Sequence, residues 1–356
     1  MFAAPELADP ASVADLAALL ARYASLVRAE IDTLLQGAPE LERFYGMMSY
    51  HLGRADRHLQ PEPARPGKSL RPTLCLLFAE ALGGDSRDCT PFAAGIELLH
   101  NFSLIHDDIQ DRSPTRRGRP TVWTLWGEAQ AINVGDGMYS LAHQAWLRAP
   151  LAERDPACFV TVARALEDTI TSLCEGQYLD IAGEGSLALT SDAYLAMIGR
   201  KTAALMGTSA WVGARCATAD PALLAAARTF GLELGLAFQI RDDLLGIWGD
   251  EAETGKSASS DIATRKMTLP VVLALEHGTV EQRADLAARY AEAPSEADDE
   301  SAIRDILTSA GADRQAAAQE EEHWQAALRA LSALNLEPVW EERLRAFAAG
   351  LVARSA

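Results

Sequence analysis

The chain has 356 residues, of which 49% are hydrophobic and 23% are charged, and its formal net charge is −18. This balance is typical of a globular protein with a sizeable core, and it excludes an intrinsically disordered chain. The acidic surface disfavours nucleic acid as a partner, because it repels a polyphosphate backbone. An anionic small-molecule substrate would therefore need cations or metal ions gathered in one pocket.

The cysteines and the N-terminal segment indicate the cellular compartment. The five cysteines are odd in number, widely scattered and without a CxxC pair, so neither a disulfide framework nor a zinc site is expected. The first residues lack a basic region ahead of an apolar run, which disfavours a signal peptide. The longest weakly polar stretch, Thr202 to Ala214, is too short for a membrane span. We therefore expect a protein of the reducing cytoplasm.

Ala, Leu, Glu and Arg dominate the chain and alternating runs of Val, Ile and Thr are almost absent, which predicts an all-α fold without a confident strand. Helices are expected at 11–36, 40–58, from Pro72 to a stop at Gly83, and at 91–111, 121–148, 157–183, 192–215, 221–248, 269–277, 302–311 and 314–352. The acidic stretch 293–301 is the expected linker. We predict a helical extension over 1–40 and one large helical domain over 41–356.

The segment GIELLHNFSLIHDDIQD carries the first acidic pattern. Asp107 and Asp111 are four residues apart and so share one helix face, whereas Asp108 is rotated away by roughly 100°. Such a pair costs about 0.2–0.5 kcal/mol on an exposed helix unless a cation lies between the carboxylates, and oxygen ligands favour magnesium. A lone DDxxD is more often a solvated face, but His100 and Ser103 extend a polar stripe along this otherwise apolar helix. The pattern therefore predicts a metal site.

A cluster of arginines follows in DRSPTRRGRPTVW. Arg116, Arg117 and Arg119 surround Gly118, and a turn there would let neighbouring side chains converge. Guanidinium groups match phosphate oxygens bidentately. The alternative is that these arginines only neutralise the aspartates, and both roles are compatible.

A second acidic pattern occurs in FQIRDDLLG. Asp242 and Asp243 end an apolar run, and Gln239 lies one turn before Asp242. Lys256 and Lys266 follow in and after a Gly/Ser-rich loop. Lysines in such a loop are more often solvated than bound to a ligand, so the loop by itself predicts little.

Five motifs then occur in one order: GKSLRP at 67–72, DDIQD followed by RRGRP at 107–120, GQYLD at 176–180, KT at 201–202, and FQIRDD with the downstream GKSASSD and KMTLP. In this order they resemble the trans-polyprenyl diphosphate synthases, the family that contains farnesyl and geranylgeranyl diphosphate synthases. The resemblance spans roughly residues 40–275. It implies a single large helical bundle of the isoprenoid synthase type with a central active-site cavity, and a homodimer.

The resemblance also implies roles for individual residues. By this resemblance, Asp107, Asp111 and Asp242 would bind magnesium, as three ions held together with the substrate diphosphate. The allylic diphosphate would be held by Arg116, Lys201, Thr202, Gln239, Lys256 and Lys266, and isopentenyl diphosphate by Lys68, Arg71, His100 and Arg117. The catalytic set would further include Asp108, Asp243, Gln177 and Asp180, although Asp180 fits a structural contact between helices equally well.

The expected chemistry needs no side-chain nucleophile. Metal ions and basic side chains would stabilise the departing pyrophosphate, so that the allylic C–O bond breaks to a carbocation in a water-poor cavity. The double bond of isopentenyl diphosphate would then attack the carbocation. By resemblance, the released pyrophosphate would accept the proton.

Chain length is expected to depend on bulk one to two turns before Asp107, because the product of this family grows back along that helix. Phe102 lies five residues before Asp107 and Ser103 lies four before it. One aromatic residue at the earlier position resembles synthases that stop near twenty carbons. Geranylgeranyl diphosphate is therefore the first expectation and farnesyl diphosphate the second.

One position departs from the family pattern. Gly246 stands where the second motif commonly has a third aspartate, which predicts at most a weakened magnesium site. Asp250 is a possible substitute, but it follows Gly249 and is expected to lie beyond the helix.

Two rival functions remain open from the sequence. A class I terpene cyclase also uses a DDxxD helix, but it needs no second diphosphate site, and the set Lys68, Arg71, His100 and Arg117 favours condensation. A non-catalytic regulatory subunit of a prenyl diphosphate synthase is encouraged only by Gly246.

Overall fold

The structure is a computed structural model that describes residues 10–62, 69–249, 260–291 and 297–353. The chain divides into two compact units. We call them the α4 unit (Ala14–Arg164 and Val212–Ala219) and the α11 unit (Ala165–Trp211, the described residues from Asp220 onward, and residues 10–13). Two short strands apart, the regular elements of the described residues are helices, so the all-α prediction is confirmed.

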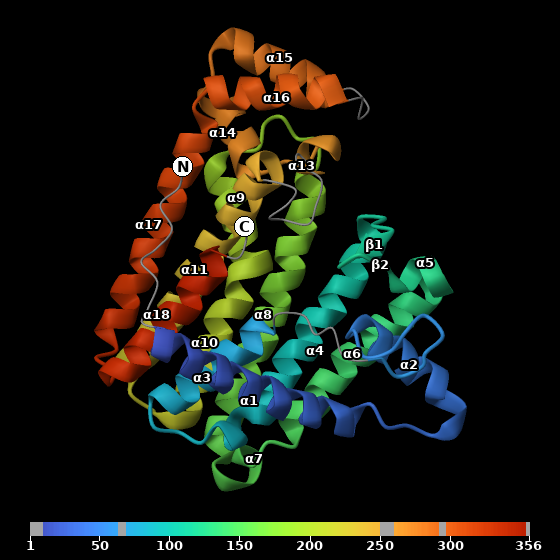
Figure 1. The fold of residues 1–356 in the computed structure, drawn as a ribbon, viewed down its shortest axis with the longest axis vertical. Coiled ribbons are helices and arrows are strands. Elements are labelled where there is room, and N and C mark those ends of the chain that lie inside the picture. The colour runs from blue at the N-terminus through green and yellow to red at the C-terminus, as the bar shows by residue number, and fades with distance from the viewer. Residues whose placement is uncertain (1–9, 63–68, 250–259, 292–296, 354–356) are drawn as a thin grey trace. The chain divides into compact units, whose positions relative to one another are not determined.

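The α4 unit holds the first acidic pattern. Its elements are most of α1 (Pro10–Leu34), the 3-10 turn η1 (Pro39–Leu41), α2 (Glu42–His51), α3 (Leu70–Ala81), α4 (Ser86–Gln110), β1 (Thr115–Arg116), β2 (Arg119–Pro120), α5 (Val122–Trp126), α6 (Glu128–Leu147), α7 (Leu151–Arg154), the start of α8 and the end of α10. Helices α4 and α6 lie side by side in Figure 1.

Helix α4 is fixed at its start by a cap and along its length by burial. The Asp85 side chain accepts a hydrogen bond from the backbone N–H of Arg87 at 2.8 Å, which satisfies one donor of the first turn. Phe92, Ile96 and Leu98 are fully buried. Burial of such side chains is worth about 1.5–3 kcal/mol each, so packing rather than propensity holds this helix.

The expected helix at 121–148 is broken in two. Gly127 lies between α5 and α6 with φ = 85°, a conformation that ends a right-handed helix and that glycine adopts without a Cβ penalty. The apolar periodicity continues across the break, which is why the sequence predicted one helix.

The arginine-rich turn forms a small β-hairpin that was not predicted. Strands β1 and β2 pair antiparallel, and the two residues between them, Arg117 and Gly118, have φ = 53° and 71°. Positive φ at both central residues defines a type I′ turn, which matches the twist of the two strands. Strands of two residues are too short to leave an alternating pattern in the sequence.

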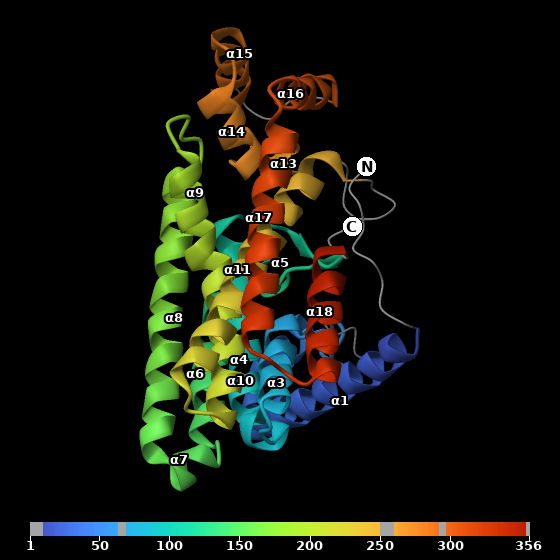
Figure 2. The ribbon, with the colours of Figure 1, turned by 90° about the vertical axis from the view of Figure 1, so that its left-hand side faces the viewer.

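The α11 unit holds the second acidic pattern. Its elements are most of α8 (Pro156–Gly183), α9 (Ser191–Ile198), the π-helical turn η2 (Gly199–Ala203), α10 (Ala204–Ala217), α11 (Pro221–Trp248), α13 (Ser260–Ala263), α14 (Leu269–His277), α15 (Val280–Ala291), α16 (Ala297–Ser309), α17 (Ala312–Ala333) and α18 (Pro338–Ala353). Helix α17 runs alongside α11 (Figure 2).

Helix α11 is the central helix of its unit. Ile240, Leu244 and Ile247 are at most 3% exposed and pack in one hydrophobic cluster with residues of α14, α16 and α17. By length and composition α11 is also apolar enough to cross a membrane. Because it carries the buried carboxylate of Asp243 and packs along α17, the core of a globular protein explains its apolar composition.

Several predicted boundaries change in this unit. The expected helix 192–215 contains the π-turn η2, and 314–352 is divided between α17 and α18 near Asn335, whose φ is 47°. Helix α15 was not predicted. Helix α16 begins at Ala297, inside the expected linker, whose first residues, 293–296, lie outside the described residues. The predicted domain boundary at residue 40 stays a prediction.

Candidate active site

The C-terminal end of α4 presents two carboxylates. Asp111 is the C-cap residue, and its backbone N–H donates to the carbonyl of Asp107 at 2.8 Å, so the two residues are one turn apart as the spacing predicted. Asp107 is half-buried and Asp111 is exposed. A helix C-terminus carries partial negative charge, which adds to that of the carboxylates. This end of α4 is therefore suited to a cation.

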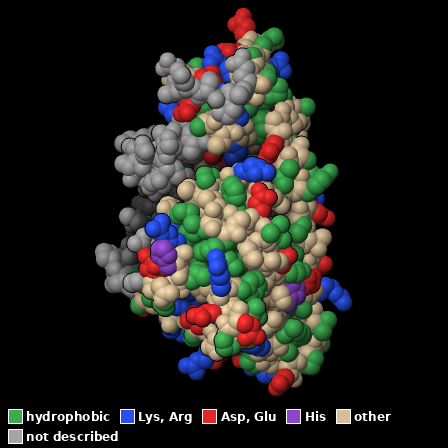
Figure 3. All heavy atoms as spheres, turned by 90° about the vertical axis from the view of Figure 1, so that its right-hand side faces the viewer, with side chains coloured by type: hydrophobic (Ala, Val, Ile, Leu, Met, Phe, Trp, Pro, Cys, Tyr) green, Lys and Arg blue, Asp and Glu red, His purple; other side chains and the backbone are tan. Residues whose placement is uncertain are grey.

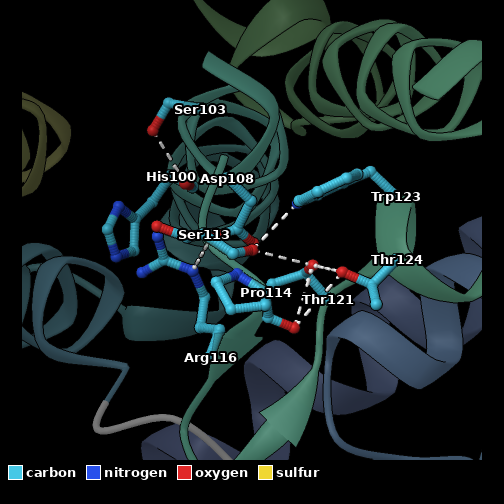
Figure 4. Close-up of polar contacts among 9 residues, drawn as sticks. All are labelled: His100, Ser103, Asp108, Ser113, Pro114, Arg116, Thr121, Trp123 and Thr124. Atoms are coloured by element: carbon cyan, nitrogen blue, oxygen red, sulfur yellow. Dashed lines mark hydrogen bonds and ion pairs between the residues drawn. The ribbon is translucent and has the colours of Figure 1, made fainter. Parts of the chain in front are cut away.

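Asp108, between them, turns into the protein. It is 2% exposed, and Nε of Arg116 donates to its Oδ1 at 2.7 Å (Figure 4). Burial raises the pKa of Asp108 to about 6, although Arg116 opposes that rise. Arg116, predicted to bind the allylic diphosphate, thus ties the hairpin to α4.

Hydrogen bonds from side chains to backbone carbonyls also hold the hairpin. Nε1 of Trp123 donates to the carbonyl of Ser113 at 2.8 Å, and the hydroxyl of Thr121 donates to the same carbonyl at 3.0 Å (Figure 4). Arg119 donates to the carbonyl of Ala55 at 2.6 Å and stacks on the ring of Tyr50. Arg119 is therefore structural, and it leaves Arg117 at the tip of the turn.

A basic cluster lies along α4, two turns before Asp107. Nη1 of Arg71 and Nε2 of His100 are 3.2 Å apart. Burial, reinforced by Arg71 and Arg117, lowers the pKa of His100 well below its usual value, so His100 is neutral at pH 7. Burial also lowers the pKa of Arg71 to about 10, which leaves it charged. Three of the four residues predicted to bind isopentenyl diphosphate are thus gathered, and Lys68 lies outside the described residues.

Three residues that were not predicted complete this region. Glu97 and Asn101 are buried beside the cluster and His51 is half-buried. Desolvation together with Arg117 and Arg116 lowers the pKa of His51 to about 3. Ser69 donates to Glu97 at 3.2 Å. Among the described residues, the second oxygen of Glu97 and Nε2 of His51 have no hydrogen-bond partner. In the sequence, Glu97 could have been identified as a candidate site residue only because it is a carboxylate inside the apolar run GIELL.

Arg117 borders two cavities in the α4 unit. One is lined by residues that include His51, Asp108 and Arg116. The other is lined by residues that include Glu97 and Asn101. The turn therefore places this guanidinium where an anion could reach it.

In the α11 unit, Asp243 corresponds to Asp108 of α4, because each is the buried second aspartate of an Asp-Asp pair. It is 1% exposed and accepts hydrogen bonds from the hydroxyl of Tyr194 at 2.5 Å, from Nε2 of Gln239 at 3.1 Å and from the backbone N–H of Leu269 at 3.2 Å. Burial raises the pKa of Asp243 to about 6, and Lys266 opposes that rise. Asp242 is half-buried beside it.

The KT motif lies in the π-turn η2, a type of element that often marks a functional site. A Cβ on Gly176 would lie 2.4 Å from the backbone nitrogen of Lys201, so only glycine lets α8 approach this turn. Lys201 donates to Asp180 at 2.5 Å, and Thr202 donates to Gln239 at 3.0 Å. The GQYLD and KT motifs are therefore in contact. In this structure Asp180 joins α8 to η2, which is the structural alternative that the sequence allowed beside a catalytic role. Gln177 is buried in the same helix.

Lys266 lies among carboxylates. Desolvation alone would lower its pKa, but Asp261, Asp243, Asp180 and Asp242 outweigh desolvation and raise it. Lys266 is therefore charged at neutral pH. Lys256 lies outside the described residues.

The residues present fit magnesium only in combination with other ligands. The described residues contain no group of three His, Cys, Asp or Glu side chains placed to hold a metal ion. A hard ion that takes one or two carboxylates and completes its shell with water and phosphate oxygens is consistent with the pair at the end of α4.

Phe102 and Ser103 lie on α4 between the basic cluster and the acidic end. The hydroxyl of Ser103 donates to the carbonyl of His100 at 2.9 Å (Figure 4). The ring of Phe102 packs on His106 and on Tyr139 of α6, with centroid distances of 5.1 and 5.3 Å. Phe102 is therefore part of an aromatic wall between α4 and α6.

Comparisons with known proteins identify the family of this chain. The polyprenyl synthetase family model matches residues 57–307. The chain is 42% identical over 307 residues to a geranylgeranyl diphosphate synthase of Mycobacterium tuberculosis (85% of this chain, 86% of the relative), and 41% identical over 295 residues to a (2E,6E)-farnesyl diphosphate synthase of Mycobacterium bovis (82% and 81%). The crystal structure of a polyprenyl synthetase from Streptomyces coelicolor A3(2) is similar with a TM-score of 0.85 and 34% identity, covering 94% of this chain and 99% of that one. The chain belongs to the polyprenyl synthetase family and is a prenyl-transferring enzyme.

Proposed function

We propose that this enzyme condenses isopentenyl diphosphate with an allylic diphosphate to a linear prenyl diphosphate, with geranylgeranyl diphosphate as the first candidate product and farnesyl diphosphate as the second. One observation carries the proposal: α4 presents the carboxylates of Asp107 and Asp111 at its end and the Arg71–His100–Arg117 cluster two turns earlier. The two groups suit two different diphosphates, one bound through metal and one bound directly.

The basic cluster would hold isopentenyl diphosphate. Arg71 and Arg117 supply fixed positive charge, and a neutral His100 donates one hydrogen bond without adding charge. The positive φ of Arg117 holds its backbone in a turn that few non-glycine residues adopt, a strain that is common at binding sites. We include Lys68 in this set on its place in the GKSLRP motif.

The acidic helices would hold the allylic diphosphate. The family is generally magnesium-dependent. Asp107, Asp111 and Asp242 would bind magnesium, in our proposal as three ions, which when bound neutralises the diphosphate and stabilises the departing pyrophosphate. Lys266 and Lys201 add positive charge, and Thr202, Gln239, Arg116 and Lys256 complete the proposed set. Lys201 and Arg116 are paired with carboxylates in this structure, so their release toward substrate oxygens is part of the proposal.

The reaction then balances without a protein nucleophile. The allylic C–O bond breaks and its electron pair leaves with pyrophosphate. The double bond of isopentenyl diphosphate forms the new C–C bond, and one proton passes from the adjacent carbon to pyrophosphate. The enzyme binds and orients both substrates and keeps water from the allylic cation.

The proposed product length depends on α4. The names of the similar relatives cover both twenty- and fifteen-carbon products. Phe102, packed against Tyr139, is the bulk that stops the growing tail in our proposal, and the small Ser103 leaves the adjacent position open.

We also propose a homodimer in the cytoplasm. Ile132 and Leu147 of α6 are 46% and 62% exposed, and a second copy packed on α6 would bury them. Figure 3 shows one face of the molecule, on which basic, acidic and hydrophobic side chains are interspersed.

One experiment tests the reaction. Purified protein is incubated with magnesium, radiolabelled isopentenyl diphosphate and dimethylallyl, geranyl or farnesyl diphosphate, and product length is measured. We expect labelled prenyl diphosphates that end at twenty carbons. Hydrocarbon or alcohol from farnesyl diphosphate alone would favour the cyclase, and turnover that appears only with a partner synthase would favour the regulatory subunit.

A further inference from the structure

Gly246 is the position at which the second acidic motif lacks its third aspartate, one turn after Asp242. The space beside it is occupied. A Cβ on residue 246 would lie 2.1 Å from Oδ2 and 2.6 Å from Cγ of Asp261, and contacts below 3.0 Å are essentially never seen. The carboxylate of Asp261 therefore lies against the backbone of α11 where an aspartate side chain at 246 would begin.

Asp261 reaches this place from a fixed turn. It belongs to α13, where its neighbour Ile262 is fully buried in the core of the α11 unit. The carbonyl of Asp261 accepts a hydrogen bond from the backbone N–H of Lys266 at 2.9 Å, and Arg265 closes the turn with φ = 56°. The backbone carbonyl of Asp261 thus holds the backbone of Lys266, and the side chain of Asp261 faces α11.

The charges agree with this arrangement. Among the carboxylates that act on Lys266, Asp261 has the largest effect, ahead of Asp243, Asp180 and Asp242. The carboxylate of Asp261 therefore adds negative charge next to Gly246, one turn after Asp242, and attracts the ammonium group of Lys266.

We propose that Asp261 is a positioning residue that supplies, from α13, the third carboxylate of the second acidic motif, and that Gly246 is the residue that makes room for it. The inference rests on the proposed function, because its role is to place Lys266 and to support the magnesium site at Asp242. It removes the one observation in favour of a non-catalytic subunit, since the carboxylate missing from α11 is present in space.

A consequence is that restoring the family pattern should damage this enzyme. An aspartate at 246 would clash with Asp261 and bring two carboxylates within a few ångströms of each other, which raises the energy of the charged state of both. If the motif were simply defective, the same substitution would improve it. The two interpretations therefore predict opposite effects of Gly246→Asp on the affinity for magnesium–pyrophosphate: a loss if Asp261 supplies the carboxylate, and a gain if the motif is defective.

The test measures binding of inorganic pyrophosphate with magnesium by calorimetry, which needs no turnover, together with kcat and the KM of each substrate. The variants are Gly246→Asp, Gly246→Ala, Asp261→Asn and the double exchange Gly246→Asp with Asp261→Gly. We expect the three single variants to lose about 10- to 100-fold in affinity for the magnesium–pyrophosphate pair, as outer-shell changes at metal sites do, and the double exchange to regain most of that loss.

Gly350→Ala is the matched control, because it adds a methyl group to a helical glycine of α18 with nothing within 4 Å, and it should leave binding unchanged. Thermal unfolding checks each variant. Should Gly246→Asp fail to fold, Asp261→Asn, which keeps the shape of the side chain, decides alone.

Tighter binding by Gly246→Asp, or unchanged binding by Asp261→Asn, would overturn the inference. Wild-type protein that neither binds magnesium–pyrophosphate nor forms a prenyl diphosphate would instead refute the proposed function.

Discussion

The α4 and α11 helices carry the same Asp-Asp pair, and in both the second aspartate is buried while the first is half-buried. The surroundings of the buried residue differ. Asp108 is bound by one arginine of a surface hairpin, whereas Asp243 is bound by a tyrosine hydroxyl, an amide and a backbone N–H. In each helix the buried aspartate joins the helix to the segment that carries the cations. In each pair the first aspartate is thus available to bind metal, and the second aspartate stabilises the packing of the helix.

The helices also differ one turn after the first aspartate. On α4 that position is Asp111, the C-cap residue of the helix, and on α11 it is Gly246, with Asp261 beside it from another element. One acidic site is therefore encoded within a single helix, and the other is assembled from two segments.

The largest expected effect is on catalysis. Asp107→Asn and Asp242→Asn should each lower kcat by about 10²- to 10³-fold, because each removes a proposed metal ligand. Half-maximal activity should require more magnesium in both variants, as a titration would measure. Since neither side chain is fully buried, thermal stability should stay near that of the wild type. Full activity in either variant would remove that helix from the proposed metal site.

The next effect concerns stability and separates the two buried aspartates. Asp243→Ala should lower the free energy of unfolding by about 3–5 kcal/mol, because three donors lose their acceptor inside the protein. Asp108→Ala should cost only about 1–2 kcal/mol, because Arg116, whose side chain is 30% exposed, can turn to water. Urea denaturation of both variants measures the difference. Equal losses would mean that the two aspartates have the same structural role.

Product length should respond to one helix only. Phe102→Ala on α4 should lengthen the product by at least one five-carbon unit, because it removes the aromatic wall shared with Tyr139. Phe238→Ala is the matched control, four residues before Asp242 on α11, and it should leave the length unchanged. Chromatography of the dephosphorylated products gives the readout. An unchanged length in the Phe102 variant would refute the assignment of the stop.

The smallest effect concerns pH and uses Glu80, a carboxylate of α3 that belongs to neither motif. Burial alone would raise the pKa of Glu80, but hydrogen bonds from Arg22, Ser86 and Tyr23 outweigh burial and lower it. Stability from a lowered carboxylate pKa is present above the unfolded value, about 4.3, and is lost as pH falls through the folded value. Glu80→Gln should therefore cost about 1 kcal/mol or less at pH 7, because Arg22 is half exposed, and the difference should vanish in acid.

The stability contributed by the buried aspartates depends on pH in the opposite direction. Because folding raises the pKa of Asp108 and Asp243 to about 6, their contribution is greatest below about pH 4 and is lost as pH rises through 6. Thermal unfolding between pH 3 and 8 separates the two kinds of carboxylate. A Glu80 variant whose deficit persists in acid would contradict the lowered pKa.

The sequence predicted the helices that bury a continuous apolar face, such as α4, α8 and α11, because that periodicity is local. It predicted less well where a single backbone conformation decides the path. Gly127 divides one expected helix, and the type I′ turn at Arg117 creates a hairpin too short to leave a pattern. In both cases one or two residues with positive φ outweigh the periodicity of their neighbours.

What the sequence by itself determined is the chemistry: oxygen ligands one turn apart at Asp107 and Asp111, basic residues at fixed distances from them, and membership in a family by the order of five motifs. Only the tertiary structure decided which carboxylates are buried, that Asp180 pairs with Lys201, and that Asp261 lies against Gly246. The physical reason is that spacing fixes neighbours along one helix, whereas burial and contact between elements depend on packing that no short stretch of sequence contains.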